Sequence, residues 1–108
     1  MDMNHPIARL VVLEDDQART VLIDPLPFTI GRHADRHLSF TSSHVSREHA
    51  VIHFDEEGYL IQDQGSRHGT LVNGIRTDMA RLKPGDRIEL GASSVVRCVP
   101  GGDAVVLR

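Results

Sequence analysis

The sequence predicts an all-β fold, a sandwich or barrel built from short strands. Short apolar runs recur roughly every ten residues, and they are rich in the β-branched residues Val and Ile. Turn-forming residues separate these runs, and no segment shows a sustained helical period. Many short strands divided by turns are typical of two packed antiparallel sheets. A chain of 108 residues is expected to form one domain, burying about two-thirds of the surface of its unfolded chain.

The expected strands follow the apolar runs in order. Two of them alternate apolar and polar side chains as half-buried strands do, and residues 79–82 are the only stretch with good helix formers. Asn73-Gly74 predicts a type I′ hairpin, because both central residues of that turn need a positive φ. The apolar runs cover residues 10–13, 21–23, 28–30, 50–54, 59–61, 70–72, 88–90 and 95–99.

The composition predicts the borders and the location of the domain. We expect an N-terminal tail over residues 1–7, the domain over 8–99, and a linker start over 100–108, in which residues 104–107 could form a last edge strand. No apolar stretch approaches the roughly 20 residues of a membrane-spanning helix, and the N-terminus lacks a signal-peptide pattern. The single cysteine, Cys98, cannot form an internal disulfide, so a cytoplasmic location is expected. Because it lies in an apolar run, Cys98 is interpreted as a core residue.

Positive charge gathers in two segments of a mildly acidic chain. The formal net charge of −3 argues against a nucleic-acid binder, which normally carries a basic excess, and nothing indicates a membrane surface. Residues 31–47 hold Arg32, Arg36 and Arg47 but one acid, and residues 64–77 hold Arg67 and Arg76 but no acid. Both segments also contain histidines. If the two segments meet in space, they form a local cationic surface.

Residues 44–50 read HVSREHA. Such a cluster could form a metal site, a catalytic serine–histidine pair or a pocket for an anion. A metal site is disfavoured, because His49 and His53 on one strand would lie about 13 Å apart, too far for one zinc ion. The loop histidines have no Cys-x-x-Cys or carboxylate cluster beside them. A catalytic Ser46/His49 pair is also disfavoured, because Ser46 lacks the Gly-x-Ser-x-Gly setting of a nucleophile elbow. We therefore expect no catalytic residue, no metal and no cofactor.

An anion pocket explains more of this cluster. Arg32 follows directly after the expected strand 28–30, Ser46 and Arg47 precede the strand 50–54, and residues 65–69 form a glycine-bounded loop. An arginine side chain presents a fork of donors that matches two phosphate oxygens, and a serine hydroxyl adds a directional donor. If these three loops lie at one end of a sandwich, their donors converge.

The sequence resembles the forkhead-associated (FHA) domain. The motifs that carry the resemblance are Gly31-Arg32, Ser46-x-x-His49, Gly65-Ser66-x-x-Gly69-Thr70 and Asn73-Gly74, in that order. Each motif is weak alone, but the four together on an all-β pattern are specific, and the resemblance extends from about residue 8 to residue 99. It implies a β-sandwich of about eleven mainly antiparallel strands, with loops at one end that bind phosphothreonine peptides.

The resemblance also implies a role for each matching residue. Arg32 and Ser46 would bind the phosphate, Arg47 would add a contact, and the loop residues Arg67 and His68 would contact the peptide. The residues that would shape and brace the loops are Gly31, His49, Gly69, Thr70, Asn73 and Gly74. In one departure, His68 stands where the family more often has an asparagine that bonds the peptide main chain. Because a free imidazole titrates near pH 6.5, we expect binding to depend on pH between 6 and 8 more than phosphate ionisation alone would cause.

Two functions follow from this comparison. The first is a phosphothreonine-binding signalling module without catalytic activity, whose partner is a Ser/Thr kinase substrate or a phosphorylated part of its own longer chain. A linked effector domain in such a longer chain fits this function. The alternative is an FHA-like scaffold for phosphate-independent association or self-assembly. Arg32 and Ser46 favour the first function, because a scaffold has no physical need of either residue.

Overall fold

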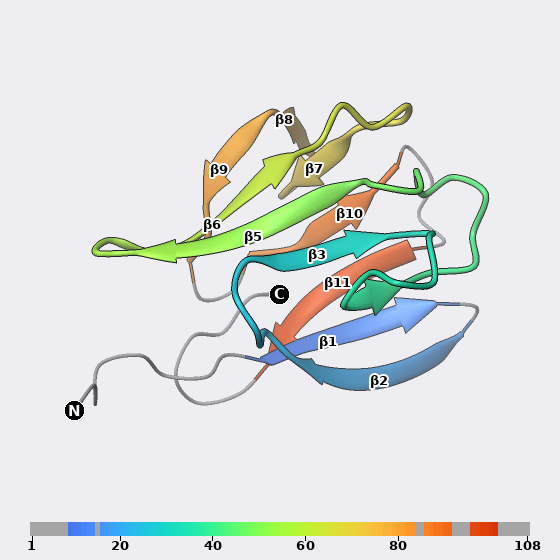
Figure 1. Ribbon diagram of the computed structural model, residues 1–108, viewed down its shortest axis with the longest axis horizontal. Coiled ribbons are helices and arrows are strands. Elements are labelled where there is room, and N and C mark those ends of the chain that lie inside the picture. Colours follow the sequence, from blue (N-terminus) through green and yellow to red (C-terminus); the bar gives the residue numbers. More distant parts are fainter. Residues whose placement is uncertain (1–8, 15, 84–85, 92–95, 102–108) are drawn as a thin grey trace.

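The structure, a computed structural model, is a sandwich of two β-sheets (Figure 1). It describes residues 9–14, 16–83, 86–91 and the backbone of 96–101, and no helix in these ranges is long and apolar enough to cross a lipid bilayer. The strands are β1 (Arg9–Glu14), β2 (Gln17–Leu22), β3 (Phe28–Gly31), β4 (Leu38–Ser39), β5 (Ala50–Asp55), β6 (Gly58–Asp63), β7 (Thr70–Val72), β8 (Ile75–Thr77), β9 (Met79–Arg81), β10 (Ile88–Leu90) and β11 (Val96–Gly101).

The strands divide into a six-stranded sheet and a five-stranded sheet. The first has the order β2-β1-β11-β10-β7-β8 and the second has the order β4-β3-β5-β6-β9. Every pairing is antiparallel except that of β3 with β4, which is parallel. The predicted all-β fold of about eleven mainly antiparallel strands is therefore confirmed.

The alternation of apolar side chains explains the core. In the five-stranded sheet Phe28 pairs with Ile52, and Ile52 pairs with Ile61, so that one row of buried side chains crosses three strands. Val12 and Ile88 contribute from the six-stranded sheet, and neither exposes any surface. Because strand side chains point alternately to the two faces, each sheet turns one apolar face inward and leaves polar residues outside.

The structure departs from the predicted strands at the edges of the sheets. β4 and β9 were not predicted, and residues 79–81 form a strand although they include good helix formers, whereas β8 forms the hairpin with β7 that Asn73-Gly74 predicted. These strands have two or three residues each and depend on pairing with a neighbour, as β9 does with β6. β2 begins at Gln17, four residues before the expected strand at 21–23, because its polar, exposed residues pair with β1. β11 continues to Gly101, past the expected end at Val99, and Pro100 pairs with Leu10.

Some expectations fall outside the described residues. These are the N-terminal tail at 1–7, the start of the expected strand at Val95 and the edge strand at 104–107. The backbone of Cys98 pairs with Val12 and with Ile88, between β1 and β10.

The pairing register brings three loops to one end of the sandwich, on the right in Figure 1. Ile30, Ala50 and Asp63 lie in one row at this end of the five-stranded sheet. In the other sheet Thr70 pairs with Leu90, and the amide of Gly91 donates to the carbonyl of Gly69 at 2.7 Å. The loops after β3, before β5 and between β6 and β7 therefore start or end at this same edge.

Candidate functional site

Arg32 is held by the backbone of the loop that precedes β5. Its amide donates to the carbonyl of Ser46 at 2.9 Å, and its side-chain Nε donates to the carbonyl of Val45 at 3.0 Å. Gly31 makes this approach possible, since a Cβ there would lie 2.1 Å from the carbonyl oxygen of Arg47. The side chain of Arg32 is exposed, and no described residue accepts a hydrogen bond from its two Nη groups. Arg32 therefore presents two fixed donors to solvent.

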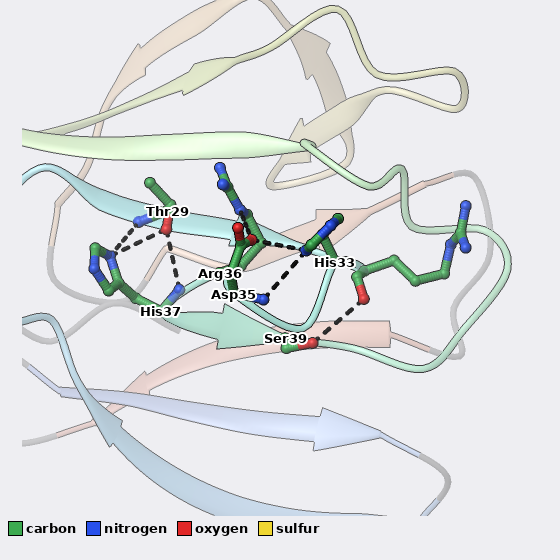
Figure 2. A network of polar contacts seen from close by, with 7 residues as sticks. Thr29, His33, Asp35, Arg36, His37 and Ser39 are labelled. Atoms are coloured by element: carbon green, nitrogen blue, oxygen red, sulfur yellow. Dashed lines mark hydrogen bonds and ion pairs between the residues drawn. The ribbon is translucent and has the colours of Figure 1, made fainter.

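A polar network fixes the loop between β3 and β4 (Figure 2). The carboxylate of Asp35 lies 2.8 Å from His33 Nδ1 and 3.1 Å from Arg36 Nε. The hydrogen bond from Arg36 lowers the pKa of Asp35. At the far side of the loop, His37 Nδ1 accepts the amide of Thr29 at 3.0 Å, and Thr29 Oγ1 accepts the amide of His37 at 3.0 Å. Because the one acid of this cationic segment pairs with its own loop, it does not neutralise Arg32.

The hydroxyl of Ser46 joins two of the loops. Its Oγ accepts the backbone amide of Arg67 at 2.9 Å. An amide can only donate, so the oxygen acts as acceptor in this bond and the hydroxyl proton of Ser46 is directed elsewhere. The side chain is half-buried. Ser46 therefore ties its loop to the loop that follows β6 and retains one donor for a further partner.

His49 is fully buried beneath these loops. Its Nδ1 accepts the amide of Ser46 at 3.0 Å, so Nδ1 carries no proton, and the protonated Nε2 donates to the carbonyl of Gly69 at 2.8 Å. Burial lowers the pKa of His49, against the opposing effect of the Gly69 carbonyl. Both ring nitrogens are thus occupied by backbone groups, and neither is placed as a base for the hydroxyl of Ser46.

Asp63 holds the loop between β6 and β7, a role that sequence reasoning missed. Its Oδ1 accepts the hydroxyls of Ser66 at 2.6 Å and Thr70 at 2.7 Å, and its Oδ2 accepts the amides of Gly65 and Ser66 at 2.9 Å. Desolvation opposes ionisation, but the hydrogen bonds from Ser66 and Thr70 outweigh it and lower the pKa of Asp63. The available signal was an aspartate at a strand end three residues before a serine, which favours a local side-chain to backbone turn.

The two cationic segments meet at this end of the fold. Besides the bond between Ser46 and Arg67, the rings of His44 and His68 lie with their centroids 5.4 Å apart at an angle of 53°. Arg47 and Arg67 are exposed and form no ion pair with any residue in the described ranges. Arg32, Arg47 and Arg67 therefore carry positive charges around the hydroxyl of Ser46 that no ion pair in the described part of the chain neutralises.

The remaining residues of the predicted set lie beneath or away from this surface. Thr70 is fully buried and bonds Asp63. Asn73 and Gly74 form the β7–β8 hairpin with φ of 53° and 83°, at the other end of β7 from Gly69. The side chain of Asn73 donates to Asp86 at 2.9 Å and accepts the amide of Arg87 at 3.0 Å. Its polar atoms are therefore used within the fold, remote from Ser46.

The described residues of this site are not arranged to coordinate a metal ion. Within the described ranges, no group of three or more His, Cys, Asp or Glu side chains is gathered closely enough to hold an ion. His49, the most deeply buried imidazole of the site, has no nitrogen left for a ligand bond. What the site offers is a set of hydrogen-bond donors in a positive field, which suits an anion.

Solved structures with this architecture include several FHA domains. The chain superimposes on the Slr1951 protein from Synechocystis with a TM-score of 0.78 and 29% identity, over 90% of this chain and 96% of that one. It is similar to the FhaA FHA domain solved in complex with the intracellular domain of Rv3910, with a TM-score of 0.77 and 29% identity over 87% of this chain and 99% of that one. A third, from a study of phosphothreonine-dependent FHA domain interactions, gives a TM-score of 0.76 and 28% identity over 90% and 99% of the two chains.

Sequence comparison points the same way. Protein FraH of Nostoc is 35% identical over 99 residues, which cover 82% of this chain and 34% of FraH. The glycogen accumulation regulator GarA of Mycobacterium tuberculosis is 33% identical over 69% of this chain and 46% of GarA. The chain thus spans less than half the length of these relatives. The sequence model of the FHA domain matches residues 28–91, and the chain belongs to the FHA-domain family.

Proposed function

We propose that this domain binds proteins phosphorylated on threonine, with the phosphate held by Arg32, Ser46 and Arg47. The observation that carries the proposal is the hydroxyl of Ser46, whose oxygen accepts the amide of Arg67 while its proton remains free to donate. The free Nη groups of Arg32 belong to the loop whose backbone is bonded to Ser46. Two unpaired donors on adjoining loops, in a field of positive charge, suit a phosphate dianion.

The remaining contacts of the peptide would come from the loop between β6 and β7. Arg67 is exposed, and half-buried His68 follows it, with its ring tilted at 53° to the ring of His44. The imidazole of His68 would bond the main chain of the ligand in place of the more usual asparagine amide. Arg47, whose carbonyl accepts the amide of His33 at 3.3 Å, has an exposed side chain that would extend toward the phosphate.

The relatives support this function. One similar FHA domain was solved with the intracellular domain of another protein, and a second belongs to a study of phosphothreonine-dependent interactions. A partner that is a substrate of a Ser/Thr kinase, or a phosphorylated segment of the same longer chain, would provide the ligand. FHA domains act as binding modules, and catalysis would reside in a partner or a linked domain.

The expected affinity is moderate. Each hydrogen bond to a charged group contributes roughly 1.5–3 kcal/mol net. Three or four such bonds, less the cost of association, correspond to micromolar binding. Without a phosphate the donors of Arg32 and Ser46 would have no partner in the complex, so discrimination against an unphosphorylated peptide would be large.

The test is fluorescence anisotropy with a degenerate phosphothreonine peptide pool and its unphosphorylated twin. We expect saturable binding of the phosphorylated pool alone, abolished by Arg32→Ala. The matched control is Arg87→Ala, which removes an exposed arginine beside the β7–β8 hairpin, remote from Ser46. Equal binding of both pools, unchanged by Arg32→Ala, would reject phosphate recognition and favour a scaffold for phosphate-independent association.

A further inference from the structure

Arg76 lies across Gly69, at the border of the cationic surface. A Cβ placed on Gly69 would stand 2.6 Å from Arg76 Nε, 2.9 Å from Cζ and 3.0 Å from Cδ. Three consecutive atoms at nearly equal distances mean that the outer part of the side chain lies flat against the glycine. Gly69 has a φ of 92° besides, a conformation that residues with a side chain rarely adopt, and the outer part of Arg76 fills the space that a Cβ would occupy.

The hairpin register explains why this arginine reaches the loop. Arg76 on β8 pairs with Leu71 on β7, so the two side chains share a face of the sheet. Thr70, the next residue along β7, is fully buried, which makes the face of Leu71 and Arg76 the outer one. Gly69 lies diagonally across from Arg76, within reach of a long side chain. The edge strand β8 thus delivers a guanidinium to the loop that carries His68.

No acid in the described ranges neutralises this guanidinium. Arg76 forms no ion pair there, either with Asp78, the exposed acid two residues along the chain, or with any other residue. Glu89 lies on the same outer face, but two strands away with Leu71 between them. A solvent-exposed arginine that rests on a glycine and has no counter-ion is a positive charge available to a ligand.

The distance from Arg76 to the phosphate site has an upper limit. Arg67 N lies 2.9 Å from Ser46 Oγ, and Arg76 lies against Gly69, two residues further along the chain. With standard backbone lengths, the guanidinium of Arg76 is no more than about 16 Å from the hydroxyl of Ser46. An extended peptide spans this distance in about four or five residues.

We propose that Arg76 is a specificity-determining residue that binds a second negative charge of the ligand, a carboxylate or second phosphate within about four residues of the phosphothreonine. The inference rests on the proposed function and names the ligands that the site prefers. Arg76 pairs with the acid side chain, while Arg32 and Ser46 hold the phosphothreonine. The recognised class is then the acidic phosphothreonine peptide.

The experiment uses a phosphothreonine peptide with neutral flanks and a series in which one Glu moves from four residues before to four residues after the phosphothreonine. We expect one position, or two neighbouring ones, to strengthen binding to the wild type about fivefold, the size of a good exposed ion pair. Arg76→Gln should lose that gain and still bind the neutral peptide. Arg76→Lys, which keeps the charge, should retain part of it, and Arg87→Gln all of it.

The outcomes separate the inference from the function on which it rests. If the neutral phosphopeptide binds and needs Arg32, but no Glu position matters, the inference is wrong and the function stands. A Glu preference that persists in Arg76→Gln also overturns it, because another cation then makes the contact. If no phosphothreonine peptide binds, both fail. Thermal unfolding of each variant ensures that the losses compared are losses of binding by folded protein.

Discussion

Replacing Ser46 with alanine should separate binding from stability. In the folded domain the Oγ of Ser46 accepts one backbone amide, that of Arg67, and Arg67 is exposed. When the hydroxyl is removed, water can satisfy that amide, so the free energy of unfolding should fall by only about 0.5–1 kcal/mol. Binding should suffer more, because the variant lacks one hydrogen bond to a charged phosphate. At about 1.5–3 kcal/mol, that loss weakens the affinity roughly 10- to 150-fold.

The assay pairs fluorescence anisotropy on a phosphothreonine peptide with urea unfolding of the same variants. Ser46→Thr is the control, because it keeps a hydroxyl on the same carbon and should recover most of the affinity. Binding by Ser46→Ala within about threefold of the wild type would refute the reasoning, since the hydroxyl proton would then have no role in the complex. A fall of several kcal/mol in the free energy of unfolding would refute the structural reasoning. That reasoning assigns the hydroxyl of Ser46 one hydrogen bond within the fold, which water can replace.

Other substitutions probe the framework and the pH dependence. Asp63→Asn replaces an oxygen that accepts two hydrogen bonds with a donor, and urea unfolding should show a loss of about 2–4 kcal/mol; a loss under about 0.5 kcal/mol would contradict the assigned role. Burial lowers the pKa of His49, so below the unfolded value near 6.5 the unfolded chain binds the proton more readily, and the free energy of unfolding should fall as the pH falls. In nitrogen NMR spectra at pH 7, His49 should show the tautomer with its proton on Nε2, and a proton on Nδ1 would contradict the assigned hydrogen bonds. Gly31→Ala should lower the melting temperature and the affinity together, since its Cβ meets a backbone carbonyl; a variant with unchanged melting would show that the loop can yield.

The strands that build the core were predictable because a strand with one buried face alternates apolar and polar residues in the sequence. Residues 28–30 and 50–54 alternate, and in the structure Phe28, Ile30, Ala50 and Ile52 are buried while Phe54 is half-buried against the core. The edge strands carry no such pattern. Three of the four residues that begin β2, Gln17, Arg19 and Thr20, are polar, and all four pair with β1 while remaining exposed. Where a strand exists only because a neighbour offers hydrogen bonds, its sequence is free to vary, and no local pattern predicts it.

The candidate site was predictable to a similar extent. The order of the motifs indicated that the loops of Arg32, Ser46 and Arg67 converge, and the structure bonds Ser46 to the other two. The four bonds of Asp63 and the position of Arg76 were not predictable. They depend on the direction of side chains in folded loops and on the pairing of an edge strand. The spacing of residues in the sequence shows neither the direction of these side chains nor the pairing of that strand.

The site is divided between bonds that fix it from beneath and donors that remain above it. Beneath, the buried His49 and the carboxylate of Asp63 are fully engaged with backbone and hydroxyl groups of the loops. Above, the Nη groups of Arg32 and the proton of Ser46 have no partner in the described chain. Because the lower bonds already hold the loops, a ligand does not have to order them, and less of its interaction energy is lost on binding. The same division explains why Ser46 and Arg76 should change affinity with little effect on folding, whereas His49 and Asp63 should change both.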